Sequence, residues 1–156
     1  MQKRNPESLI PIVKELEYFI QFKERRKDKI SNSDVAWQID HSLKVINLVT
    51  EALASSDPNQ YKWRFNKWRL LLFTLNYIPR GKARAPKIVK PPEVISSNDL
   101  ITQVNLAYKY VESLKPINEN AYFTHFVFGQ LNKPKTIQFL HLHTTHHLKI
   151  IKDILK

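Results

Sequence analysis

Four of the six histidines of this chain lie within the stretch "FLHLHTTHHLKII", residues 139–151. Imidazole is a general acid or base near neutral pH and the commonest metal ligand among side chains. The chain has no cysteine, which excludes thiolate catalysis, iron–sulfur clusters and cysteine-based zinc sites. Any metal bound here must therefore take histidine or oxygen ligands.

The spacing of these histidines divides them into two pairs. A helix turns by about 100° per residue, and apolar side chains fill one half of the helix expected over residues 135–155. His143 and His147, four residues apart, fall near the middle of that apolar half, whereas His141 and His146 lie near its edges. We therefore interpret His143 and His147 as inward-facing, and His146 as a surface residue or a neighbour of a bound ion.

A fifth histidine also points inward. In "DVAWQIDHSLKVINLVTEAL", residues 34–53, His41 shares one stripe with Val45 and Leu48, while Asp40 and Lys44 face the other way. A single buried imidazole is usually explained by hydrogen bonds to its neighbours. Three imidazoles that face the same interior are harder to explain in this way, because each ring has two nitrogens that need partners. A divalent metal satisfies one nitrogen of each ring, and neutral imidazole suits Zn²⁺, Ni²⁺, Fe²⁺ or Co²⁺.

The elements that must position these side chains are mostly helical. Only two glycines occur, which disfavours a turn-rich β fold and a Gly-rich phosphate loop. Apolar periodicity and capping residues predict helices over 7–27, 33–56, 61–78, 96–115 and 135–155, with Ser33 as one N-cap. The proline-rich stretch 78–93 must be a loop. Four long amphipathic helices with partly long connections predict an all-α four-helix bundle with a crossover. Between the second and third helices of this bundle we expect an extra helix, residues 61–78, and a basic loop, "PRGKARAPK".

Length and hydropathy indicate one domain over residues 1–156. No signal-peptide core is visible, and the longest apolar stretch, residues 70–73, is far too short to span a bilayer. We therefore expect a cytoplasmic protein without a transmembrane segment.

The net charge of +11 belongs to one segment. No acidic residue occurs between Asp57 and Glu93, where nine lysines and arginines lie, and the rest of the chain is nearly balanced. Arg80, Lys82 and Arg84 are candidate anion-binding residues, and "KWRFNKWR", residues 62–69, interleaves cations with aromatic rings. A nucleic acid, an anionic membrane or an acidic ligand would fit such a pattern. The simpler interpretation, which we favour over nucleic acid, is that the aromatic rings pack on the helices while the charges are solvated.

Three motifs resemble the DinB-like superfamily, to which the bacillithiol-dependent and mycothiol-dependent S-transferases are related. They are "WQIDHSL", "HFVFGQL" and "HLHTTHHLKII". They are most similar to a branch of unknown function with a His-Pro-Phe-Phe-Gly segment before the last helix and a His-x-x-His-His run within it. The "PRGKARAPK" loop is similar as well, so the resemblance covers the chain from about residue 30 onward.

The resemblance implies a four-helix bundle with a divalent metal, Zn or Ni before Fe, Co or Mn, held by His41, His143 and His147. His125 takes the place of the histidine of the His-Pro segment, but Phe126 replaces the proline. We therefore expect His125 to contact a helix end or a ligand residue rather than the ion.

Three neutral ligands would leave the charge of the metal intact and a coordination position open, as in catalytic sites. Such a metal lowers the pKa of a bound water or thiol. By family analogy we expect a metal-dependent transferase that activates a low-molecular-weight thiol, or a hydrolase, acting on a small molecule. The alternative is a non-enzymatic binding protein or homodimeric scaffold that uses residues 60–90 for an anionic partner. No general base is evident in the sequence.

Overall fold

The computed structural model describes residues 5–81 and 86–156. These residues form a mostly helical structure with one two-stranded sheet. The helices are α1 (Ile10–Phe19), α2 (Val35–Ala54), α3 (Lys67–Leu75), α4 (Ser97–Ser113) and α5 (Lys133–Leu155), and the strands are β1 (Tyr122–His125) and β2 (Gly129–Asn132). Short 3₁₀ helices occur at Pro6–Leu9, Ile20–Phe22, Pro58–Gln60 and Lys87–Val89.

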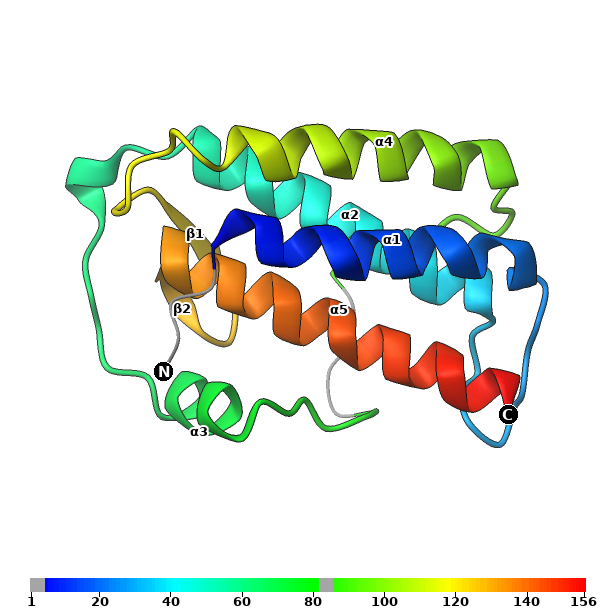
Figure 1. Ribbon diagram of the computed structural model, residues 1–156. Coiled ribbons are helices and arrows are strands. Elements are labelled where there is room, and N and C mark those ends of the chain that lie inside the picture. The colour runs from blue at the N-terminus through cyan, green and yellow to red at the C-terminus, as the bar shows by residue number, and fades with distance from the viewer. Residues whose placement is uncertain (1–4, 82–85) are drawn as a thin grey trace.

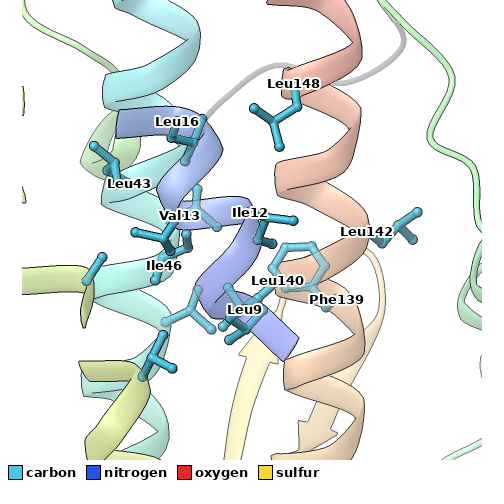
Figure 2. Close-up of a cluster of buried hydrophobic side chains, with 14 of the residues drawn as sticks. Leu9, Ile12, Val13, Leu16, Leu43, Ile46, Phe139, Leu140, Leu142 and Leu148 are labelled. Carbon is cyan, nitrogen blue, oxygen red and sulfur yellow. The ribbon is translucent and has the colours of Figure 1, made fainter. Parts of the chain in front are cut away.

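Helices α1, α2, α4 and α5 lie side by side, and α3 lies apart from them at the edge of the molecule, next to α5 (Figure 1). The inward faces of the four helices form one hydrophobic core. Figure 2 shows this core from the side of α1, with Leu43 and Ile46 of α2 on one side and Leu140 and Leu148 of α5 on the other. Helices α2 and α5 are the two that carry the inward-facing histidines, and they pack directly on each other.

The first helix is shorter than the predicted span 7–27, because α1 ends at Phe19. Downstream, the carbonyls of Lys23 and Arg25 accept hydrogen bonds from the amides of Ala36 and Val35, at the start of α2. These carbonyls are therefore not available for a continuing helix, and the basic run "KERRKDK" is a connection instead. The N-cap of α2 is Asp34 rather than Ser33, since the Asp34 carboxylate accepts from the Trp37 amide at 2.8 Å.

The third helix is also shorter than predicted. The Asn66 side chain accepts from the Arg69 amide and so caps α3 at its start, while Asn76, at φ 49°, ends it in the left-handed region. Residues 61–66 are extended, and the Lys62 amide donates to the Gln130 side chain of β2. Trp63 and Trp68 are more than half exposed, so the prediction that these aromatic rings pack on the helices is wrong.

Between α4 and α5, where the sequence predicted no helix or strand, the chain forms an antiparallel hairpin in which Tyr122 pairs with Asn132 and His125 with Gly129. Gly129 has a φ of 69°, which a side chain would strain. Capping residues begin α4 as predicted, and they form a capping box in which Ser96 and Asp99 exchange side-chain and backbone hydrogen bonds. Among the described residues, no helix is both long and apolar enough to cross a membrane.

Candidate metal centre

Helices α2 and α5 bring three histidine rings together in the interior. One nitrogen from each of His41, His143 and His147 lies within 4.8 Å of the others. The ring centroids are 5.1 Å apart for His41 and His143, 4.8 Å for His41 and His147, and 4.6 Å for His143 and His147. These are the three histidines that helical periodicity turned inward. Their spacing places them in position to bind one metal ion.

The ring of His41 is oriented by the backbone of the chain segment that follows the basic loop. Its Nδ1 lies 2.9 Å from the carbonyl oxygen of Val89. A carbonyl only accepts hydrogen bonds, so Nδ1 must carry the hydrogen and the neutral ring keeps its lone pair on Nε2. A hydrogen bond from the other ring nitrogen to a carbonyl is how metal-ligating histidines are commonly fixed.

Gln38 orients the second ring in the same way. The Gln38 side-chain oxygen accepts from Nδ1 of His147 at 2.7 Å, and its amide nitrogen donates to the Ser31 hydroxyl at 3.2 Å. Gln38 is only 2% exposed. The sequence reasoning missed this residue. A signal was present, because Gln38 stands three residues before His41 and so shares its helix face.

His143 supplies the third nitrogen, and its environment differs. Its Nδ1 is buried and has no hydrogen-bond partner within residues 5–81 and 86–156. An unsatisfied buried nitrogen is energetically unfavourable, and coordination to a metal would satisfy it. The donor set of three imidazoles and this orphaned nitrogen therefore fit a divalent metal of the Zn²⁺ or Ni²⁺ type.

Burial keeps all three rings neutral. Desolvation lowers the pKa of His41, although the hydrogen bond to the Val89 carbonyl and the charge of Asp40 partly oppose it. Desolvation, with smaller effects from neighbouring histidines, holds the pKa values of His143 and His147 well below the usual 6.5. Metal ligation requires the neutral imidazole, so these ligands need no proton removed at neutral pH.

Aromatic side chains form the walls of the cluster. Trp37 stacks on His41 with ring centroids 4.9 Å apart, and Phe139 lies 5.6 Å from His143. His41 and His147 are buried, whereas His143 is only partly so. The Nδ1 atom of His143 is itself buried, so the partial exposure of this residue lies on its other atoms.

His125 belongs to the hairpin rather than to the ligand set. Its Nδ1 accepts hydrogen bonds from the amides of Val127 at 3.1 Å and Phe128 at 3.2 Å, which closes the turn between β1 and β2. Desolvation lowers its pKa to about 4. The ring of Phe139 separates it from His143, since Phe139 contacts both. His125 thus supports one wall of the cluster without reaching its centre.

His146 is half-buried beside the cluster, so its interpretation as a surface residue needs correction. Its ring meets that of His147 edge-on at 5.1 Å. Desolvation and the charge of Arg80 lower its pKa to about 4, against a raising effect of its hydrogen bond to the Ile78 backbone. The Nδ1 of His141 lies 3.4 Å from the hydroxyl of Thr145, which is one helical turn further along α5.

The described residues on the two sides of positions 82–85 lie next to the histidine cluster. The chain on one side of the loop contacts His146 through Ile78, and the chain on the other side contacts His41 through Val89. Arg80 forms an ion pair with Asp153 of α5 at 2.8 Å. Lys82 and Arg84, the other two candidate anion-binding residues, lie outside the described residues.

Three polar side chains near the helix faces of the cluster, those of Asp40, Ser42 and Tyr108, have partners elsewhere. Asp40 is buried, accepts from Gln103 of α4 at 2.6 Å and pairs with Lys44 of its own helix at 2.7 Å. Tyr108 donates to Glu17, and the Ser42 hydroxyl donates to the Gln38 carbonyl, each at 2.7 Å. As expected for Asp40, none of these contacts involves the three histidines.

Comparison with known proteins places the chain in a family. A family model described as "Protein of unknown function (DUF1569)" matches residues 39–153, a span that contains all three clustered histidines. No curated protein and no solved structure matches the chain. Because the family model covers well over half of the sequence, the protein belongs to the DUF1569 family.

Proposed function

We propose that this protein is a metal-dependent enzyme that holds one divalent ion, Zn²⁺ or Ni²⁺ before Fe²⁺, Co²⁺ or Mn²⁺, on His41, His143 and His147. The domain, residues 1–156, is proposed to be a DinB-like four-helix bundle with α1, α2, α4 and α5 as its helices. The carrying observation is that three neutral imidazoles from two helices bring a nitrogen each within 4.8 Å of one another.

The surroundings of the rings support a catalytic rather than a purely structural ion. Three protein ligands leave at least one position open on a tetrahedral or larger coordination sphere. A divalent ion there would act as a Lewis acid that lowers the pKa of a coordinated water or thiol. Val89 and Gln38 fix two rings in the tautomer that ligation requires, and Trp37 and Phe139 pack against His41 and His143.

The proposed reaction class rests on the resemblance to the DinB-like superfamily and on the three imidazole ligands. We propose a transferase that activates a low-molecular-weight thiol, or a hydrolase, with a small-molecule substrate entering beside His143. The partial exposure of His143 supports that entry, because His41 and His147 are both buried.

Metal content of the purified protein tests the site. Protein prepared without a histidine tag should contain close to one equivalent of a divalent metal by elemental analysis. The His143→Ala/His147→Ala double variant should lose it. The His141→Ala/His146→Ala variant, which removes as many histidines from the same helix, should keep it. Substoichiometric metal in the wild type, or equal metal in both double variants, would contradict the assignment.

Turnover is tested separately from metal binding. The metal-loaded protein is assayed with a panel of small thiols plus electrophiles and with ester and amide substrates, before and after chelation. Activity that disappears on chelation and returns with metal supports the enzyme. Stoichiometric metal without any turnover across both substrate classes would favour the non-enzymatic alternative.

A further inference from the structure

Helix α3 presents an apolar stripe to solvent. Trp68, Leu71 and Leu75 are 51%, 47% and 60% exposed, respectively. Their spacing puts them within about 60° of one another around a helix, since each residue turns it by about 100°. Arg69 and Phe73, on the opposite side of α3, are buried. The helix therefore turns apolar side chains toward solvent as well as toward the protein.

The chain on both sides of α3 carries further exposed apolar side chains. Trp63 and Phe65 in the extended segment, and Tyr77 after the helix, are each more than half exposed. We call these six residues the aromatic patch: Trp63, Phe65, Trp68, Leu71, Leu75 and Tyr77. Large exposed apolar side chains that gather in one short stretch of chain, rather than occurring singly, indicate an interaction site.

The aromatic patch is also strongly cationic. Lys62, Arg64 and Lys67 are interleaved with it and exposed, and no acidic residue occurs from Pro58 to Pro92. The Lys67 ammonium lies 5.6 Å from the centre of the Trp68 ring. Whatever covers this surface must accept apolar side chains and carry negative charge.

The patch is held rigidly rather than hanging free. The guanidinium of Arg69 donates to the carbonyls of Phe128 at 3.3 Å and Gln130 at 3.0 Å, and also to that of Arg64. Asn66 donates to the Val127 carbonyl at 2.8 Å. These bonds fasten the beginning of α3 to the hairpin, so the outward stripe is formed before any partner arrives.

We infer that the aromatic patch docks on an anionic lipid bilayer, with α3 lying in the plane of the interface. Tryptophan and tyrosine favour the membrane–water interface, leucine gains from the acyl region, and lysine and arginine reach the anionic headgroups. At nine residues α3 is far too short to span the bilayer.

The other occupants fit less well. A second copy meeting this face with the same face would bring the two cationic segments together, which like charges oppose. Nucleic acid would use the cations and stack on the rings, but it would gain little from Leu71 and Leu75. The bilayer uses both properties of the patch, and this docking is independent of the proposed metal site.

Vesicle binding tests the inference. Full-length protein is sedimented with vesicles of phosphatidylcholine alone and of phosphatidylcholine with phosphatidylserine. Binding is expected only with phosphatidylserine, and raised salt should weaken it because the headgroup charge is screened. Leu71→Ser/Leu75→Ser should lower the partition coefficient by about tenfold or more, since buried apolar area sets interfacial affinity. Lys62→Gln/Arg64→Gln/Lys67→Gln should lower it by at least as much.

Two control variants make the same kinds of substitution outside the aromatic patch. Ile101→Ser/Leu106→Ser removes exposed apolar side chains from α4, and Lys14→Gln/Lys29→Gln/Lys109→Gln gives the same net charge as the triple variant of the patch. Both should bind vesicles like the wild type. Unchanged circular dichroism and thermal unfolding of each variant establishes that its fold is intact.

Three results would overturn the inference. The first is no binding to the phosphatidylserine vesicles at low salt, or equal losses in patch and control variants. The second is single-stranded nucleic acid binding that is tighter than vesicle binding and indifferent to Leu71→Ser/Leu75→Ser. The third is that the wild type is a dimer at assay concentrations and Leu71→Ser/Leu75→Ser is a monomer, which would assign the patch to a second copy.

Discussion

At the scale of single residues, Gln38 has the role most specific to the histidine cluster. It is on α2 with His41 but orients His147 of α5, so one amide couples the two helices that supply the ligands. Its own orientation is set by Ser31. If an ion binds to the three histidines, Gln38 would orient one of its ligands without touching it.

Replacement of Gln38 by alanine should weaken metal binding while leaving all three imidazoles in place. Loss of such a partner typically lowers affinity by about 10- to 100-fold, because the ring loses its fixed tautomer and orientation. Competition with a chromophoric chelator measures the affinity. Asn47→Ala, which removes a buried amide nine residues further along α2, should destabilise the fold without this loss. Equal affinities in wild type and Gln38→Ala would refute the role of Gln38.

His125 links pH to stability in the metal-free protein. Its pKa is about 4 in the folded state, against 6.5 in an ordinary histidine, because burial disfavours the charged ring. The unfolded chain therefore binds a proton near pH 6.5 that the folded chain accepts only near pH 4. Stability from this group is complete above pH 6.5 and is lost as the pH falls through that interval.

The variant His125→Asn should reduce this pH dependence, because the asparagine oxygen can accept the same two backbone hydrogen bonds without titrating. Urea unfolding of the chelated proteins measures the free energy of unfolding at several pH values from about 7.5 to 5. The slope for the wild type should exceed that of the variant by up to about 1.4 kcal/mol per pH unit. Parallel slopes would mean that His125 does not titrate below its usual range.

At the scale of elements, the hairpin and α3 form one unit that the helical pattern alone does not predict. Arg69 is the link, because its guanidinium joins the start of α3 to carbonyls of the hairpin. The residue looks in the sequence like one more member of a cationic face, yet it is buried. Its guanidinium donates hydrogen bonds to backbone carbonyl oxygens and is not available to attract a partner.

Substitution of Arg69 by methionine should therefore destabilise the protein by about 2 to 3 kcal/mol, because several charge-assisted hydrogen bonds are lost and the carbonyls remain buried. The free energy of unfolding in urea gives the value. Arg64 is exposed and joins this network only through its backbone carbonyl, which the substitution keeps, so Arg64→Met should change stability by less than about 0.5 kcal/mol. Metal content should be the same in both variants. Similar stabilities would show that the bonds of Arg69 contribute little.

At the scale of the whole molecule, the proposed ion would join distant parts of the chain. His41 and the pair His143 and His147 are about a hundred residues apart in sequence, on two helices that pack directly on each other. An ion bound to all three exists only in the folded state. Metal binding and folding are therefore thermodynamically linked.

Addition of metal to the chelated protein should raise its stability. At a free metal concentration of 100 times Kd the free energy of unfolding should increase by about 2.7 kcal/mol, which thermal unfolding detects as a higher Tm. His143→Ala should show no such rise at the same concentration. An equal rise in Tm for wild type and variant would place the binding metal elsewhere on the protein.

The sequence by itself determined which faces of which helices carry the histidines. Periodicity is local physics, and it suffices to place His143 and His147 together on the apolar side of α5 and His41 on the apolar side of α2. Capping chemistry is equally local, so the start of α4 at Ser96 was predictable. The end of α1 was not, because the Lys23 carbonyl is taken by a hydrogen bond from the Ala36 amide, thirteen residues further along the chain.

The tertiary structure alone decided how the three rings meet and what surrounds them. Gln38 and His147 are 109 positions apart, and His41 and Val89 are 48, so no local rule pairs them. The hairpin and the exposed stripe of α3 were out of reach for the same reason. Apolar residues occur on all sides of α3, and only packing against α5 and the hairpin decides which of them are covered.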